Sequence, residues 1–98
     1  MEGLLITITS SWKPDIYIIA RILEKLWIKG GTRRKAELQM ASNLNFDIYS
    51  KYLNWIVEKE LIKIEKLSER NIKVKITQKG LKTYDIMVEW IKENVGEL

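Results

Sequence analysis

Among the side chains of this 98-residue sequence that could take part in chemistry, cations outnumber anions, with 17 Lys and Arg against 13 Asp and Glu. Histidine and cysteine are absent, which removes the commonest general base, the usual zinc ligands and every thiolate nucleophile or disulfide. No nucleophile–base pair, glycine-rich phosphate loop or metal-ligand spacing stands in their place. We therefore predict a protein that is not an enzyme and that holds no metal or other cofactor.

Positive charge is concentrated in the middle of the chain. Residues 1–28 carry equal numbers of basic and acidic side chains, whereas residues 29–82 carry thirteen basic and six acidic ones. Residues 83–98 carry one basic and four acidic side chains. A basic middle followed by an acidic end is typical of a protein that faces a polyanion, although a solvated basic surface with no partner would give the same pattern.

The first group of residues that could contact a polyanion is Arg33, Arg34 and Lys35. We predict that they begin a short helix capped by Thr32 and running to Ser42, where their positive charge would oppose the helix dipole. A backbone phosphate would favour this arrangement, because the side chains and the first helical amides could converge on one anion. A solvated run of charge is the alternative.

The second group lies on the outer side of a helix predicted from Phe46 to Lys59. Its predicted inner face consists of Phe46, Tyr49, Leu53, Ile56 and Val57. A helix of this kind can lie in the major groove, where amide, hydroxyl, ammonium and carboxylate groups read base edges. The candidates are Asn45, Asp47, Ser50, Lys51 and Asn54. A merely polar exterior would look the same.

The third group lies on a predicted β-hairpin. After Glu60 the apolar period changes from 3.6 to 2, and residues 68–71 form the turn between two strands. Five cations lie on the hairpin, namely Lys63, Lys66, Arg70, Lys73 and Lys75. Such a hairpin could follow the sugar-phosphate backbone or enter the minor groove, or its lysines could protect an exposed strand edge from aggregation.

Two further segments position these groups. Residues 14–28 form an almost continuously apolar helix that must be central, closed by Gly30 and Gly31. Residues 1–13 form an arm or a short strand. Because Met1 to Thr9 have neither a basic flank nor a long apolar run, we expect no signal peptide and no membrane contact, and hence a cytoplasmic protein.

A last helix begins after Thr77 and runs to about Asn94. Its apolar residues are spaced alternately by three and four, which is a heptad seam made of Leu81, Tyr84, Val88, Ile91, Val95 and Leu98. The seam could pack on the apolar first helix of the same chain. We favour a two-stranded coiled coil between two subunits, because the seam extends beyond what a small core can cover.

The order of elements is a helix-turn-helix followed by a wing. Together with residues 43–47, 51–53, 58–62 and 76–80, it makes the sequence resemble archaeal winged-helix DNA-binding proteins that dimerise through a long C-terminal helix. One departure is Glu60, which stands where these proteins usually have a glycine, so a strained left-handed backbone or a different helix end is expected there.

The resemblance implies one α+β, mostly helical domain: a winged helix-turn-helix over residues 14–76 with a two-stranded wing, and a dimerisation helix over residues 77–98. It implies a homodimer, arranged antiparallel, that binds double-stranded DNA as a transcriptional regulator or an architectural protein. The alternative is a winged-helix module for protein–protein interaction in a larger assembly. No small-molecule effector is indicated.

Overall fold

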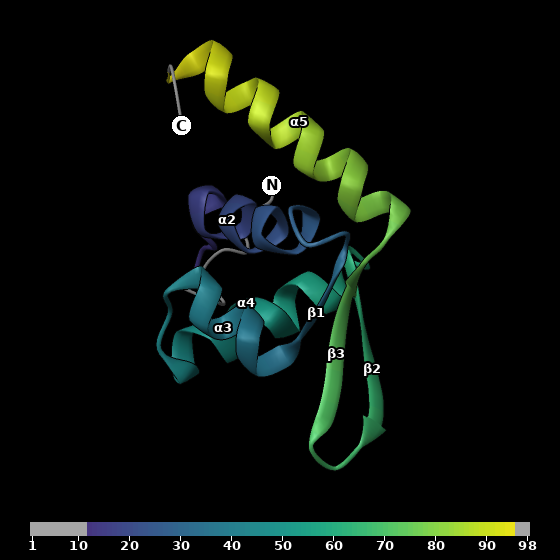
Figure 1. Cartoon of the computed structure of the whole chain (residues 1–98). Helices are drawn as coiled ribbons and strands as arrows, with labels where there is room; N and C mark the ends of the chain where they lie inside the picture. Colours follow the sequence, from purple (N-terminus) through teal and green to yellow (C-terminus); the bar gives the residue numbers. More distant parts are fainter. Residues whose placement is uncertain (1–11, 96–98) are drawn as a thin grey trace.

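The computed structural model describes residues 12–95. Along these residues the elements are α2 (Ile16–Trp27), β1 (Thr32–Arg34), α3 (Lys35–Ser42), α4 (Phe46–Glu58), β2 (Ile62–Ser68), β3 (Asn71–Ile76) and α5 (Gln78–Asn94) (Figure 1). Most of the arm predicted for residues 1–13, and Leu98 of the predicted seam, lie outside the described residues. The described part is the predicted α+β, mostly helical arrangement.

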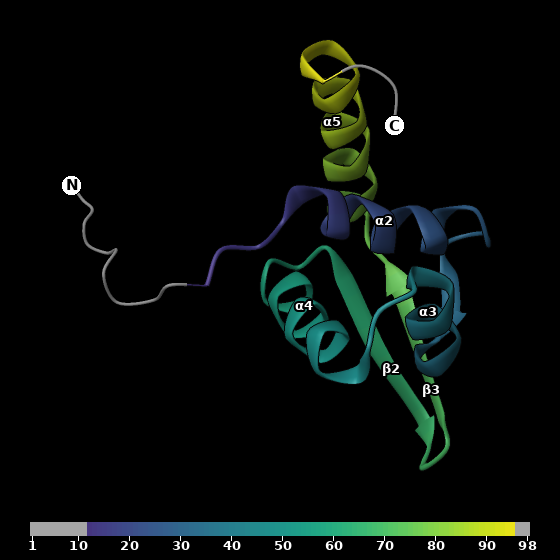
Figure 2. The ribbon, with the colours of Figure 1, turned by 90° about the vertical axis from the view of Figure 1, so that its left-hand side faces the viewer.

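Helix α2 is the centre of the molecule, as its apolar sequence predicts. It begins at Asp15, whose carboxylate accepts a 2.8 Å hydrogen bond from the backbone amide of Tyr17. Ile22, Leu23 and Leu26 are completely buried. In two views at right angles α2 lies between α5 on one side and the layer of α3 and α4 on the other (Figures 1 and 2). The core therefore forms around one helix that is covered on two sides.

The predicted hairpin is confirmed, but it belongs to a sheet of three strands in the order β1–β3–β2. Residues 32–34 pair antiparallel with residues 73–75 of β3. The prediction of a helix starting at Arg33 and capped by Thr32 is therefore wrong, because these residues form strand hydrogen bonds instead. Helix α3 begins at Lys35, and its N-cap residue Arg34 makes no side-chain cap.

The turn between α3 and α4 has the predicted chemistry. Asn43 ends α3 with a left-handed backbone (φ 56°), and the Asn45 side chain caps α4 by accepting a 2.9 Å hydrogen bond from the amide of Ile48. The predicted inner face of α4 needs two corrections. Phe46 is 62% exposed and Val57 is at the surface, whereas Tyr52 is buried. The buried face is centred on Tyr49 and Ile56, so Phe46 and Val57 fall on its rim.

The end of α4 is tied to the start of α5. Glu60 has a φ of 64°, which is the left-handed backbone expected where glycine is the usual residue. The Thr77 hydroxyl donates to the Glu60 carbonyl oxygen (2.7 Å) and accepts from the Gly80 amide (2.9 Å). A Cβ at Gly80 would collide with the Leu61 carbonyl oxygen. Thr77 therefore has a hydrogen-bonding role at this helix start, and Gly80 has a steric one.

Candidate nucleic-acid interface

A cleft of about 290 Å³ lies between the start of α4 and the wing, which is the hairpin of β2 and β3. It is lined by side chains from three separate stretches of the chain: Arg34, Lys35, Ala36, Glu37 and Gln39 from β1 and α3, Phe46 and Tyr49 from α4, and Glu69, Arg70 and Ile72 from the wing. The structure therefore brings cations of the first and third predicted groups to the beginning of the helix that carries the second group.

The cleft is held together by Tyr49. This side chain is 1% exposed, and its hydroxyl donates a 2.6 Å hydrogen bond to the backbone carbonyl of Lys35. Burial raises the pKa of the Tyr49 phenol far above its ordinary value, so the hydroxyl keeps its proton and remains a donor. The start of α3 is thereby fixed against the first turns of α4.

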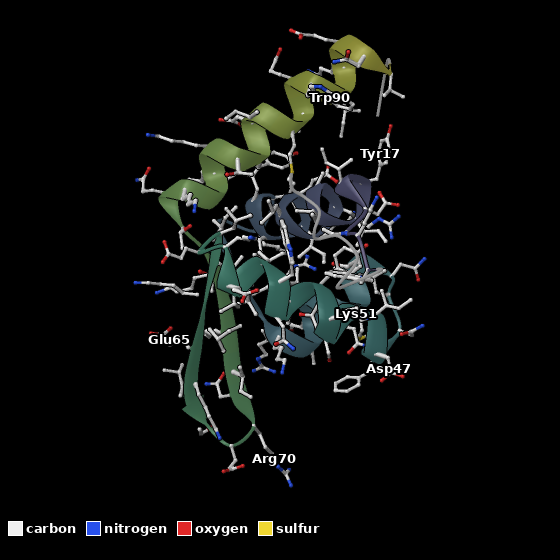
Figure 3. The ribbon with its side chains drawn as sticks, turned by 180° about the vertical axis from the view of Figure 1, so that it is seen from behind. Tyr17, Asp47, Lys51, Glu65, Arg70 and Trp90 are labelled. Carbon is white, nitrogen blue, oxygen red and sulfur yellow. The ribbon has the colours of Figure 1, made fainter. Side chains whose placement is uncertain are left out.

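The outer side of α4 is polar, as predicted. Asp47, Lys51 and Asn54 are exposed and Ser50 is half-buried. Asn45 is exposed too, but its side-chain oxygen is the acceptor of the helix cap. Figure 3 shows Asp47 and Lys51 on the same helix, with Arg70 at the tip of the wing. The exposed groups of this helix include donors and acceptors suited to base edges.

Lys51 has a neighbour that the sequence did not indicate. Its ammonium lies 5.4 Å from the centre of the Trp12 ring, which in turn packs edge-on against Tyr52 at 5.3 Å. A cation over an indole ring is attracted by the ring's electron density. Lys51 is therefore engaged at one flank of α4, on the side of Trp12 and Ile48.

The lysines of the wing divide between its tip and one face. Lys63 and Lys75 are Cα partners, as are Glu65 and Lys73, so these four side chains share a face of the sheet. Figure 3 shows Glu65 pointing away from the helices. Glu65 lies 3.8 Å from Lys75, and Glu69 at the turn lies 3.7 Å from Lys66. These exposed pairs partly neutralise the wing, which leaves Arg70, Lys63 and Lys73 as its cations outside the two ion pairs.

Arg33 is separated from Arg34. It lines a different hollow, together with Lys29, Glu37 and Met40. Successive residues of a strand point to opposite sides, so neighbouring arginines in β1 cannot act as one cluster. The prediction that Arg33, Arg34 and Lys35 converge at a helix start holds only for the last two, which line the cleft.

The predicted seam of α5 is also divided. Ile91 is completely buried within the chain and Tyr84 packs against the same core, which is the intramolecular alternative. Burial, then Glu24 and Asp85, raise the pKa of the Tyr84 phenol. Leu81 and Val88 are half-buried and Val95 is exposed.

Two apolar residues outside the predicted seam, Ile86 and Trp90, are exposed on α5 beside three carboxylates, Asp85, Glu89 and Glu93. The heptad pattern does not include these two residues, because they fall on the side of the helix opposite the seam. Phe46 was missed as a surface residue because its spacing matches the inner face. The only sequence signal was its position directly after the Asn45 cap, where a helix has not yet entered the core.

Within residues 12–95 no group of three or more Asp and Glu side chains could hold a metal ion, and no helix there is long and apolar enough to cross a bilayer. The winged helix-turn-helix family matches residues 14–94, which is most of the chain. The chain is a winged helix-turn-helix protein. In this winged helix-turn-helix chain β2 and β3 are the wing and α4 is the helix that follows the tight turn.

Solved structures share the fold of this winged helix-turn-helix chain. One is a winged-helix DNA-binding protein from STIV, with a TM-score of 0.76 and 18% identity, covering 85% of this chain and 96% of the other. Another is Sso10a-2, a DNA-binding protein from Sulfolobus solfataricus, with a TM-score of 0.71 and 20% identity. The alignment covers 83% of this chain and 81% of the Sso10a-2 chain.

A third is MepR, a transcription regulator of the Staphylococcus aureus multidrug efflux pump MepA, with a TM-score of 0.67 and 17% identity. The alignment covers 78% of this chain and 57% of the MepR chain. No curated protein matches by sequence. At these identities the likeness establishes the winged-helix fold.

Proposed function

We propose that this winged helix-turn-helix chain binds double-stranded DNA as a homodimer, with α4 in the major groove and the wing on the flanking backbone. The observation that carries the proposal is the cleft in which Arg34, Lys35 and Arg70 meet the start of α4. Cations grouped at the start of a polar helix can hold a phosphate backbone that borders the groove, while the helix reads the bases within it.

In this proposal the side chains have separate roles. Asp47 and Asn54 are exposed on the outer side of α4 and contact base edges, with the carboxylate accepting from cytosine and the carboxamide pairing with adenine. Arg34, Lys35 and Arg70 contact phosphates and carry no sequence information themselves. Lys63 and Lys73 on the wing extend the positive surface along the backbone.

The homodimer is proposed through the part of the α5 seam that the chain itself does not bury. Leu81 and Val88 are half-buried and Val95 is exposed, and the three lie along one side of the helix. A symmetric pair of such faces would bring together two copies of α4 at a fixed separation, which would match two half-sites on one duplex. The similarity to DNA-binding proteins of the same fold supports this role, with regulation of transcription and association with the nucleoid as its cellular setting.

The experiment that tests DNA binding is a titration of the full chain with a labelled duplex of arbitrary sequence at several salt concentrations. We expect the logarithm of the affinity to fall linearly with the logarithm of salt concentration, with a slope of about −0.9 per contacted phosphate. A flat dependence would exclude phosphate contacts. Selection of bound fragments from random DNA would then separate a specific regulator, which enriches one motif, from a coating protein, which enriches none.

A further inference from the structure

Phe46 is the first residue of α4, and it is 62% exposed. Large aromatic side chains are normally buried, and this phenyl ring is not part of the core that Tyr49, Leu53 and Ile56 form on the same helix. A single exposed apolar residue is common on a protein surface, so the surroundings of this ring decide whether it has a partner.

The surroundings of Phe46 identify that partner. The ring lines the cleft that also holds three cations, Arg34, Lys35 and Arg70, and two carboxylates, Glu37 and Glu69, of which Glu69 is paired with Lys66. An apolar protein segment seated there would bury a cleft with more cations than carboxylates and provide no negative charge for it, which is unfavourable. A nucleic-acid duplex satisfies both demands at once, since phosphates meet the cations while the groove floor offers one apolar group, the methyl of thymine.

The geometry of helix docking points in the same direction. When a recognition helix enters the major groove, its N-terminal residues are the ones that reach the base edges. Phe46 follows the cap residue Asn45 and precedes Asp47, so it lies at that leading end. We propose that Phe46 is a specificity-determining residue that contacts the C5 methyl of a thymine in the major groove. This inference rests on the proposed DNA binding and adds a preference for thymine at one position under each copy of α4.

The test compares two duplexes that differ only in this methyl. One has a mixed sequence with thymine, and in the other every thymine is replaced by uracil, which removes the methyl and leaves base pairing and phosphates in place. We expect the full chain to bind the uracil duplex about fourfold more weakly for each recognition helix engaged, the ratio expected for one buried methyl group. In F46A the two duplexes should bind equally, whereas F46L should keep part of the difference.

The matched control is Met40→Ala. Met40 is a large exposed apolar residue on α3 that lines the hollow with Arg33 rather than the cleft. The Met40 variant should retain the full difference between thymine and uracil, which shows that the effect belongs to Phe46 and not to apolar surface in general. Because both residues are exposed, circular dichroism should show both variants folded.

Three outcomes contradict the inference, and they separate it from the proposed function. If the unchanged chain binds both duplexes equally well, DNA binding stands and the methyl contact is wrong. The same conclusion follows if F46A retains the difference, because the altered shape of the uracil duplex would then be its cause. If the chain binds neither duplex, the proposed function itself fails and the inference fails with it.

Discussion

The hydroxyl of Tyr49 on α4 lies 2.6 Å from the carbonyl oxygen of Lys35 at the start of α3. This one hydrogen bond joins the helix proposed to read bases to a residue proposed to hold a phosphate. Both partners belong to the lining of the cleft, which Arg70 of the wing completes. The relative position of the reading helix and its flanking cations is thus fixed inside the protein before any ligand arrives.

Replacing Tyr49 with phenylalanine tests this connection. The Tyr49 variant loses a buried hydrogen bond and leaves the Lys35 carbonyl without that donor, so we expect the free energy of unfolding to fall by about 1 kcal/mol. Urea denaturation measures the change. The matched control is Tyr17→Phe on the exposed side of α2, which should leave the unfolding free energy within error. Equal effects at both positions would contradict the role given to Tyr49.

The same residue predicts a dependence on pH. Burial raises the pKa of Tyr49 above its ordinary value of 10.0, so in the unfolded chain the phenol ionises near pH 10 while in the folded chain it stays protonated. The contribution of Tyr49 to stability is therefore complete below about pH 10 and is lost as the pH rises beyond it. In Tyr49→Phe the decline of the unfolding free energy above about pH 10 should be shallower than in the unchanged chain. Tyr84, whose pKa is also raised, accounts for part of the decline that remains.

A substitution at Glu60 is expected to stabilise the protein, in contrast to Tyr49→Phe. The left-handed backbone of Glu60 at φ 64° is unfavourable for a residue with a Cβ, and glycine adopts it freely. We expect Glu60→Gly to raise the free energy of unfolding by about 0.5 to 1 kcal/mol, since the relief of strain exceeds the added entropy of the unfolded chain. Thermal denaturation should show a higher midpoint. Lys59→Gly, one residue earlier with a φ of −82°, should instead destabilise the chain.

Arg33 and Arg34 are a built-in pair for testing the interface, because they are adjacent in sequence and line different hollows. Arg34→Ala should weaken binding to any duplex several-fold. It should also reduce the slope of log affinity against log salt concentration by about 1 for each protomer bound. Arg33→Ala should change both quantities much less. An equal loss in the two variants would mean that the cleft does not face DNA.

The homodimer is tested by charge on the two sides of α5. Val88 belongs to the proposed dimer seam, and Ile86 lies on the opposite side of the same helix. Val88→Glu should convert the dimer to a monomer in light scattering, while Ile86→Glu should leave the mass unchanged. If the chain without substitutions is a monomer, the proposed dimer is ruled out. If Ile86→Glu gives a monomer and Val88→Glu does not, the dimer interface lies on the face of Ile86 and Trp90 instead.

Local chemistry in the sequence predicted most of the fold. The two asparagines around Leu44 specify a turn, and the cap at Thr77 specifies a helix start. The alternation of apolar and polar residues specifies strands β2 and β3. None of these signals depends on distant residues. The left-handed backbone at Glu60 was one of two outcomes expected from the resemblance to winged-helix proteins that usually have a glycine there, the other being a different helix end.

Features that depend on distant partners could not be predicted in the same way. Residues 32–34 have no strand pattern of their own and become β1 because β3 offers a free edge. That pairing separates Arg33 from Arg34, which the sequence presented as one group. The rotation of α4 is likewise set by tertiary contacts: Tyr52 turns inward, where its hydroxyl accepts a 2.8 Å hydrogen bond from the amide of Asp15, and Phe46 turns outward.

The most direct measurement of the central claim is a titration of the isotope-labelled chain with a DNA duplex, followed by the shifts of its backbone amide signals in NMR spectra. We expect the largest changes at Arg34 and Lys35, along α4 from Asn45 to Asn54, and at Arg70, with small changes around Lys29 and on the outer side of α5. Shifts concentrated on α5, or spread evenly over the surface, would contradict an interface formed by α4 and the wing.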